Sequence, residues 1–516
     1  MKFFRRGPLF IFALVLIWRV WLLVFTVQPI PASDAFGYDG GVVNFLHGGR
    51  YCNPSLALVF PISGTEIYAT YPPLYQGALL SWMKLFGTSV VSAMGLHLVL
   101  FAVSGWLVLA IVRLFFPAAT GYGLTALLFF GITFDDRPEC LGYVFGLISL
   151  WMVMRQISEP HFRAGTAAGL WVSLLLGLYT SVIVGAYFFG IGFLACAAAC
   201  LWRRNAYWFA PFIGVAVLFA VSTFAIARLE PLWWAGFLES ARQQSVMTTG
   251  FRRPQAADVM KLVRTTPIFL LSLAAVPWVV ARRKEILAQA SAWLALVVAI
   301  FFMGWALLAL SVTLLPANYF YYAVLTQVIL AAGLLALAQK HFPEHERCLR
   351  AALLAGTLLV SVRAIAMSTW GVACAAGNSY QSTQAVLRAE LEPFVKSDQP
   401  VLVSSPYLYS AAGLGVRNGI HSDWYFDHAN WRENTQMDAL ARLKPAKLVL
   451  TQFDYYRNFE AVVAQLGGHP ELVAVQVRDL ARVRTPDSIP SMQRVVQHIS
   501  WAPVIVDMNW KPPIAP

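Results

Sequence analysis

Acidic residues gather in two short segments that border long apolar stretches. The first segment, SDAFGYDGGVVNFLHGGRY (33–51), places Asp34 and Asp39 directly after an apolar run. Carboxylates in such a position can act as a base on an incoming hydroxyl or amine, or can bind a divalent cation. A helix-capping or solvated pair is the alternative that the spacing alone leaves open.

The second segment, FDDRPECLGY (134–143), carries four charges within five residues: Asp135, Asp136, Arg137 and Glu139. Charges at the end of a membrane-spanning helix lose water at a high cost, so we expect them to pair with each other, an ion or a substrate. Pro138 is suited to begin the following helix, whose N-terminal dipole would help Arg137 to hold a phosphate. Helix capping with a surface ion pair is the alternative.

Aromatic and basic residues occur in three further segments. The segment YATYPPLYQG (68–77) contains Tyr71 and a Pro-Pro pair that can start a helix at Leu74. The segment LPANYFYYAV (315–324) contains three tyrosines, which also fit an aromatic belt at the membrane interface: Tyr319, Tyr321 and Tyr322. Three basic residues are candidate phosphate partners, although a face that binds lipid headgroups would use the same residue types: Arg252, Arg253 and Lys261.

The elements that must position these residues are membrane helices. Of the 516 residues, 58% are apolar and 12% are charged, and the mean hydropathy is +0.61. A soluble protein of this size could not cover such a surface, whereas runs of about 20 apolar residues cross a bilayer as helices. We predict eleven spans: Pro8–Gln28, Ser89–Phe116, Ala118–Phe134, Pro138–Ile157, Gly165–Tyr179, Val182–Trp202, Tyr207–Arg228, Thr266–Ala281, Ser291–Leu315, Tyr319–Gln339 and Ala351–Trp370.

Charge predicts the orientation of these spans. With the N-terminus in the cytoplasm, the cytoplasmic segments hold 14 basic and 4 acidic residues, whereas the opposite loops before residue 376 hold nine of each. This asymmetry follows the positive-inside rule, so the net charge of +12 reflects topology and predicts no nucleic-acid partner. We expect an integral protein of the bacterial inner membrane with the N-terminus cytoplasmic.

The chain divides into a membrane domain (1–375) and a polar tail (376–516), which the odd number of spans places in the periplasm or outside the cell. Two outer loops are long, at about 29–88 and 229–265, and the first contains two amphipathic stretches, 35–46 and 74–85. The tail alternates short apolar runs such as 400–405 and 447–453 with helical stretches. This alternation predicts a small C-terminal α/β domain.

The order of these motifs resembles bacterial membrane glycosyltransferases of the C-type superfold (GT-C), relatives of the protein O-mannosyltransferases and aminoarabinose transferases. The resembling features are an Asp-containing first loop, Gly48-Gly49-x-Tyr51, the PPL element after Tyr71, the acidic RPE turn and the later NYF span. The resemblance implies that Asp34 is the catalytic carboxylate and that Glu139, with Asp136 nearby, is the second acidic site. Some members of this superfamily carry an acidic-basic pair immediately before the prolines, where this chain has Thr70 and Tyr71. The resemblance therefore implies neither a metal site nor specificity for aminoarabinose.

The resulting hypothesis is a glycosyltransferase that moves a hexosyl or pentosyl group from a polyprenyl-phosphate donor to a lipid, glycan or protein acceptor on the outer face. Besides the acidic residues, we expect eight residues to bind substrate: Tyr38, Asp39, Tyr71, Arg137, Arg252, Arg253, Tyr319 and Tyr321. If a divalent cation takes part, Asp34 and Glu139 are its expected ligands. The alternatives are a transporter or lipid flippase and a non-catalytic scaffold; the gathering of acidic groups at one face favours an enzyme.

Overall fold

The computed structural model describes most of the membrane domain and most of the C-terminal domain. The described residues are 2–28, 30–31, 35–57, 60–115, 129, 137–159, 163–203, 209–248, 256–281, 284, 291–313, 319–341, 346–374, 379–416, 419–421, 436–480 and 501–511. Several predicted site residues lie outside these ranges: Asp34, Asp136, Arg252 and Arg253. The side chains of Tyr321 and Lys261 are likewise outside the description.

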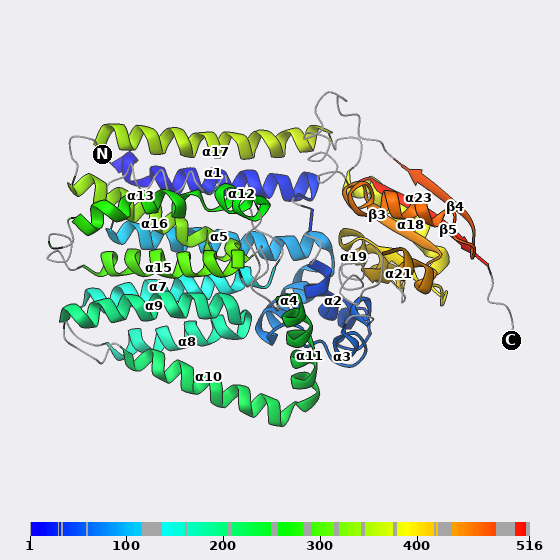
Figure 1. The fold of residues 1–516 in the computed structure, drawn as a ribbon, viewed down its shortest axis with the longest axis horizontal. Helices are drawn as coiled ribbons and strands as arrows, with labels where there is room; N and C mark the ends of the chain where they lie inside the picture. The colour runs from blue at the N-terminus through cyan, green and yellow to red at the C-terminus, as the bar shows by residue number, and fades with distance from the viewer. Residues whose placement is uncertain are drawn as a thin grey trace.

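Long helices run side by side through the membrane domain (Figure 1). Within the described residues, ten helices coincide with predicted spans: α1 (Lys2–Thr26), α5 (Val90–Phe115), α7 (Glu139–Ser158), α8 (Ala164–Thr180), α9 (Val182–Arg203), α10 (Ala210–Leu229), α13 (Pro267–Ala281), α15 (Ala292–Thr313), α16 (Val324–His341) and α17 (Glu346–Cys374). Seven of the described helices are long and apolar enough to cross a membrane: α1, α5, α7, α9, α10, α15 and α16. A polytopic helical fold is therefore confirmed, whereas the count of eleven stays a prediction, and the predicted span 118–134 lies almost wholly outside the described residues.

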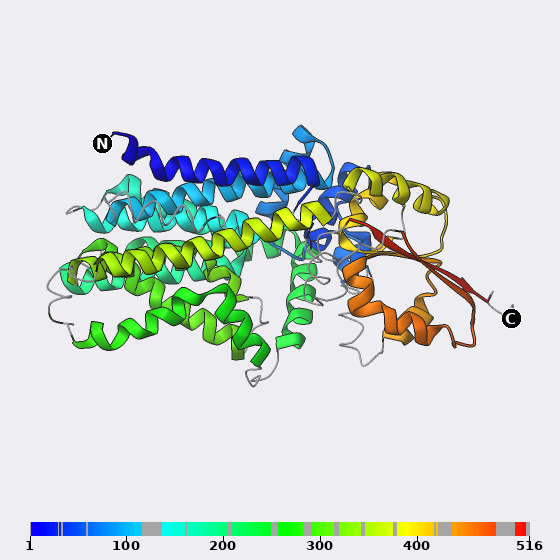
Figure 2. The ribbon, with the colours of Figure 1, turned by 90° about the horizontal axis from the view of Figure 1, so that it is seen from above.

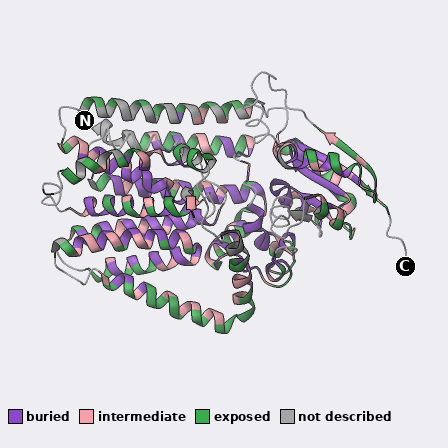
Figure 3. Cartoon of the chain, viewed as in Figure 1, coloured by how far each residue is buried: buried purple, intermediate pink, exposed green. Residues whose placement is uncertain are grey.

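The helices differ in how they bury their apolar residues. The contact between α7 and α9 is close, because a Cβ atom at Gly146 would lie 2.3 Å from the ring of Phe188. Helix α10 instead leaves an apolar stripe exposed, at Ile213, Val217, Val221 and Phe224, and Figure 3 shows exposed residues along it. An exposed apolar stripe of this length is what a helix presents to lipid.

The two long loops that we predict to lie on the outer side fold into short helices that touch each other. The first loop forms α2 (Ala35–Leu46), η1 (Pro54–Leu56), α3 (Pro61–Thr65) and α4 (Pro73–Phe86), and the second forms α11 (Pro231–Thr248) and α12 (Ala256–Thr265). The backbone N–H of Ile62 donates to Glu239 Oε2 at 3.1 Å, which joins α3 to α11. The amphipathic stretches at 35–46 and 74–85 are thus confirmed as helices.

The C-terminal domain is a five-stranded sheet with helices. Its described elements are α18 (Tyr380–Leu391), η5 (Glu392–Phe394), β1 (Val401–Val403), α19 (Ser405–Leu414), β2 (Gly419–His421), α21 (Gln436–Leu443), β3 (Lys447–Thr451), α22 (Gln452–Asp454), η6 (Tyr455–Phe459), α23 (Glu460–Leu466), β4 (Leu472–Asp479) and β5 (Pro503–Trp510). The strand order is β2-β1-β3-β5-β4. Strand β1 pairs in parallel with β2 and β3, and β5 pairs antiparallel with β3 and β4.

The C-terminal domain sits at the end of the bundle where α1 finishes, in both ribbon views (Figures 1 and 2). The indole N–H of Trp501 donates to the carbonyl of Thr26 at 3.3 Å. The backbone N–H of Phe36 donates to Ser405 Oγ at 3.2 Å. These hydrogen bonds tie the domain to α1 and to α2.

Candidate functional site

Four segments that are far apart in the sequence meet at the end of the bundle nearest the C-terminal domain. Helix α2 supplies Tyr38, and the residue pair before α4 supplies Tyr71. The hydroxyl of Tyr71 donates to that of Tyr38 at 3.4 Å, and the two rings meet edge to face with centroids 4.7 Å apart. The guanidinium carbon of Arg137 lies 5.7 Å from the centre of the Tyr38 ring, a distance at which a cation is attracted to an aromatic face.

Glu139 and two tyrosines complete this cluster. Glu139 is the first residue of α7 and only 3% exposed. The hydroxyl of Tyr322 donates to Glu139 Oε1 at 2.9 Å. The ring of Tyr319 stacks on that of Tyr322, with centroids 5.2 Å apart. Both tyrosines belong to η3 (Tyr319–Ala323), the short turn that precedes α16.

The pKa of Tyr71 is affected by four other residues of this group: Glu139, Tyr319, Arg137 and Tyr38. Burial raises the pKa of the Tyr71 phenol, and the charges of Glu139 and Tyr319 raise it further, whereas Arg137 and the hydrogen bond with Tyr38 lower it. Tyr71 therefore stays a neutral hydroxyl that can donate or accept hydrogen bonds at ordinary pH. We refer to Tyr38, Tyr71, Arg137, Glu139, Tyr319 and Tyr322 as the tyrosine–glutamate cluster.

Nearby residues in the sequence set the backbone positions of Tyr71 and Tyr38. Pro72 caps α4 and Pro73 occupies its first turn, so the chain direction at Tyr71 is set by two restricted backbones. The side-chain amide of Gln76 donates to the carbonyl of Tyr38 at 2.9 Å. The hydroxyl of Tyr68 donates to the carbonyl of Gly37 at 2.8 Å. Two hydrogen bonds, one from α4 and one from the segment before it, therefore hold the backbone of α2.

A glycine lets α2 approach the rest of the first loop. A Cβ atom at Gly40 would lie 2.2 Å from the side-chain nitrogen of Asn53. That nitrogen donates to the carbonyl of Phe36 at 2.8 Å. The DGG sequence within α2 is therefore explained by packing, because any side chain at Gly40 would displace Asn53.

The cluster brings together five residues that the sequence predicted: Tyr38, Tyr71, Arg137, Glu139 and Tyr319. It adds Tyr322, which sequence reasoning assigned only to the aromatic belt; its spacing of three residues from Tyr319 in a tight helical turn was the available signal. Asp39 does not join the cluster. Its carboxylate is fully buried and accepts hydrogen bonds from Tyr75 and Tyr409.

The sequence predicted Asp34 and Glu139 as the ligands of a divalent cation, and this site stays a prediction. Within the described residues, no group of three or more His, Cys, Asp or Glu side chains is placed to hold a metal. Asp34 and Asp136 lie outside those residues.

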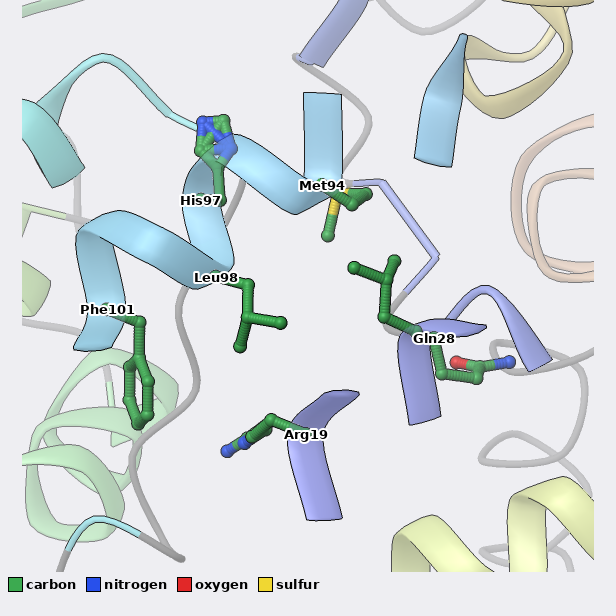
Figure 4. A pocket seen from close by; sticks show the side chains of 7 residues that line it. Arg19, Gln28, Met94, His97, Leu98 and Phe101 are labelled. Atoms are coloured by element: carbon green, nitrogen blue, oxygen red, sulfur yellow. The ribbon is translucent and has the colours of Figure 1, made fainter. Parts of the chain in front are cut away.

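A narrow pocket lies beside the first loop, between α1 and α5 (Figure 4). Its lining is Arg19, Leu23, Gln28, Met94, His97, Leu98 and Phe101. The guanidinium of Arg19 lies over the rings of Trp18 and Phe101, at 4.8 and 5.6 Å from their centres. This arrangement accommodates an arginine within a spanning helix by placing it against aromatic faces inside the bundle.

No protein-family model and no curated protein matches the chain. Among solved structures, it is similar to ArnT from Cupriavidus metallidurans bound to undecaprenyl phosphate, with 13% identity over 97% of this chain and 98% of that one and a TM-score of 0.49. The apo state of the same protein gives 12% identity, 97% of both chains and a TM-score of 0.49. An oligosaccharyltransferase from Archaeoglobus fulgidus gives 12% identity, 89% of this chain, 71% of that one and a TM-score of 0.49.

Proposed function

We propose that this protein is a glycosyltransferase that moves a sugar from a polyprenyl-phosphate donor to an acceptor on the outer face of the membrane. The observation that carries the proposal is the tyrosine–glutamate cluster. Three separate motifs of the resemblance, the first loop, the PPL element and the RPE turn, contribute residues to it, together with the NYF segment. Packing of hydrophobic spans alone would not require a buried glutamate beside an arginine and four tyrosines.

The chemistry assigns a role to each kind of side chain. Arg137 supplies a positive charge for the donor phosphate, because a guanidinium makes strong charge-assisted hydrogen bonds to phosphate oxygens. The aromatic faces of Tyr38, Tyr71 and Tyr319 suit a sugar ring or an isoprene unit. Glu139 accepts a hydrogen bond from the hydroxyl of Tyr322, and we assign its carboxylate to the recognition of an acceptor or sugar hydroxyl.

The transfer step balances without an additional reactant. The acceptor oxygen forms a bond to the anomeric carbon while the bond from that carbon to the phosphate oxygen breaks, and polyprenyl phosphate leaves with the electron pair. The acceptor proton passes to a carboxylate, for which Asp34 is our candidate. Asp34 immediately precedes α2, which carries Tyr38.

The test uses the purified full-length chain in lipid nanodiscs. Radiolabelled polyprenyl-phosphate hexoses and pentoses serve as donors, and envelope membranes serve as the acceptor source. Release of polyprenyl phosphate and label in the acceptor fraction are measured together. We expect transfer by the wild type and about 100-fold slower transfer by Glu139→Gln, which keeps the hydrogen bond from Tyr322 but loses the charge.

Glu66→Gln is the matched control. Glu66 belongs to the same outer loop, but its side chain is half exposed and pairs with Arg50 at 3.7 Å, away from the cluster. This variant should transfer at the wild-type rate, because an exposed ion pair contributes little to stability. No transfer from any donor by the wild type would contradict the proposed function. Equal, measurable rates for all three proteins would leave that function standing and remove Glu139 from its role.

A further inference from the structure

The first loop and the C-terminal domain share a buried carboxylate. Asp39, on α2, is 0% exposed. The hydroxyl of Tyr75 on α4 donates to Asp39 Oδ1 at 2.9 Å, and the hydroxyl of Tyr409 on α19 donates to Asp39 Oδ2. A buried carboxylate is tolerated only where hydrogen bonds replace the lost water, so both tyrosines are needed to keep it in place.

This contact continues into the membrane domain. The hydroxyl of Tyr75 is also 3.1 Å from Nε2 of His97 on α5, and the two rings stack with centroids 5.8 Å apart. One chain of hydrogen-bonding groups therefore runs from α19 of the C-terminal domain through α2 and α4 to α5. Its members are separated by up to 370 residues in the sequence.

Two further contacts join the same turn of α2 to α19. The Phe36 ring meets the Tyr409 ring edge to face, with centroids 5.4 Å apart. The backbone N–H of Phe36 donates to Ser405 Oγ at 3.2 Å. Phe36 and Asp39 are three residues apart, so they lie on one face of the helix.

Tyr38 lies on a different face of that same turn. Consecutive residues of an α-helix are about 100° apart around the axis, so Asp39 can meet α19 while Tyr38 meets Tyr71 and Arg137. Helix α2 has only 12 residues. A shift of its first turns at Asp39 therefore moves the ring of Tyr38 as well.

We propose that Tyr409 is a positioning residue: by holding Asp39, it fixes α2 and keeps Tyr38 in the tyrosine–glutamate cluster, so that docking of the C-terminal domain completes the site. For its effect on sugar transfer the inference rests on the proposed function. Its effect on α2 does not depend on that function. The C-terminal domain is then a structural part of the site, although its described residues do not enter the cluster.

The protonation of Asp39 supports this role. Burial raises the pKa of Asp39 to about 7, and the hydrogen bonds from Tyr409 and Tyr75 act against that rise. The groups that face Asp39 are these two tyrosines and Tyr68, with His97 beyond Tyr75. The pKa of Tyr68 is raised mainly by burial, and the Asp39 charge adds a smaller contribution. Loss of the Tyr409 hydroxyl removes a hydrogen bond that favours the charged form, so it must raise the pKa of Asp39 further.

The decisive experiment compares Tyr409→Phe with Tyr407→Phe in the full-length chain. Tyr407 lies on the same helix, is fully buried and donates its hydroxyl to the carbonyl of Trp501 at 2.7 Å. Each variant removes one buried hydroxyl from α19: that of Tyr409 donates to Asp39 of α2, whereas that of Tyr407 donates to Trp501. Amide hydrogen exchange of residues 35–46 and the pH dependence of sugar transfer are measured for both.

We expect Tyr409→Phe to speed exchange in α2 by about tenfold or more, the size expected for losing a hydrogen bond to a charged group. It should lower kcat more than it raises KM for the donor, and it should move the acidic limb of the pH profile to higher pH. Tyr407→Phe should lower the melting temperature without accelerating exchange in α2 or moving the profile. Equal exchange and equal profiles in the two variants would overturn the inference.

The two proposals fail in different ways. If the wild type transfers no sugar from any polyprenyl donor, the proposed function is wrong, and hydrogen exchange alone then decides whether Tyr409 holds α2. If the wild type transfers sugar but Tyr409→Phe exchanges and transfers like Tyr407→Phe, the proposed function stands and the positioning role is wrong.

Discussion

Two buried carboxylates have different surroundings. Asp39 belongs to α2, and Glu139 is the first residue of α7. Glu139 is reached by Tyr322 and lies in the same cluster as Arg137, at the start of a helix whose dipole favours negative charge. Asp39 is held by the hydroxyls of Tyr75 and Tyr409 between two domains. The first setting combines a carboxylate with a guanidinium and phenol hydroxyls, whereas the second joins two parts of the protein.

The difference shows that an acidic residue next to a member of the cluster need not join the cluster. Tyr38 and Asp39 are neighbours in the sequence, yet one enters the tyrosine–glutamate cluster and the other faces the C-terminal domain. Variants near Glu139 and variants at Asp39 should therefore have different effects, and the predictions below test this difference.

The largest effect is expected from Asp34→Asn. If Asp34 accepts the acceptor proton, the variant keeps the shape of the side chain but slows transfer by about 100-fold or more. The melting temperature should barely change, because a loop carboxylate contributes little to packing. Transfer is measured from a polyprenyl-phosphate donor with melting temperature as the folding control. A folded variant with the wild-type rate would remove Asp34 from the catalytic role.

Arg137→Ala should come next. Loss of a charge-assisted contact to the donor phosphate costs roughly 1.5 to 3 kcal/mol, or about 10-fold to 150-fold in donor affinity. The measurement is donor binding to purified protein at constant ionic strength. Arg50→Ala is the control, since Arg50 is exposed and pairs only loosely with Glu66. Equal donor affinity in the Arg137 and Arg50 variants would show that Arg137 does not hold the phosphate.

Tyr322→Phe should have a smaller effect on transfer. It removes the hydroxyl that donates to Glu139 and preserves the ring that stacks on Tyr319. A neutral donor to a charged group is worth about 1.5 to 3 kcal/mol, part of which water recovers, so we expect a loss of about tenfold in kcat. The matched control is Tyr187→Phe, because Tyr187 is also buried but donates or accepts at Thr326, away from the cluster. Equal losses in both variants would indicate a packing effect.

The smallest change, in pH dependence of stability, is expected from Asp39→Asn. The folded-state pKa of Asp39 is raised to about 7 from an ordinary value of 3.8. The folded protein then binds more protons than the unfolded chain between these values, so the contribution of Asp39 to stability is full below pH 3.8 and is lost as pH rises through 7. The amide side chain of the variant cannot titrate. The difference in melting temperature between the wild type and the variant should therefore fall as pH rises from 5 to 8.

The control for this measurement is Asp454→Asn. Asp454 is buried in the C-terminal domain and accepts hydrogen bonds from Ser404 and Thr451 of the same domain. A melting-temperature difference between the wild type and Asp39→Asn that stays constant from pH 5 to 8 would contradict a raised pKa at Asp39. The same pH trend in Asp454→Asn would assign it to the loss of a buried carboxylate in general.

The sequence alone determined the parts of this protein that local physics controls. Apolar runs gave the positions of the described spanning helices, Pro72 and Pro73 gave the start of α4, and amphipathic spacing gave the bounds of α2. Each of these features depends on residues within a few turns of one another, so it can be recognised without knowledge of the fold. The sequence also predicted Tyr38, Tyr71, Arg137 and Tyr319 as substrate-binding residues and Glu139 as the second acidic site, and these five residues lie in one cluster.

The pairs of side chains that face one another across long sequence separations are visible only in the tertiary structure. Tyr322 proved to be the hydrogen-bond donor to Glu139, 183 residues away, although the sequence assigned it to an interfacial belt. Asp39, whose binding of substrate stays a prediction, accepts a hydrogen bond from Tyr409 at a separation of 370 residues. No local pattern records such pairs. The pair of Glu139 and Tyr322 joins the start of α7 to η3, whereas that of Asp39 and Tyr409 arises from the packing of α2 between α4 and α19. A rotation of about 100° along α2 separates Tyr38 from Asp39.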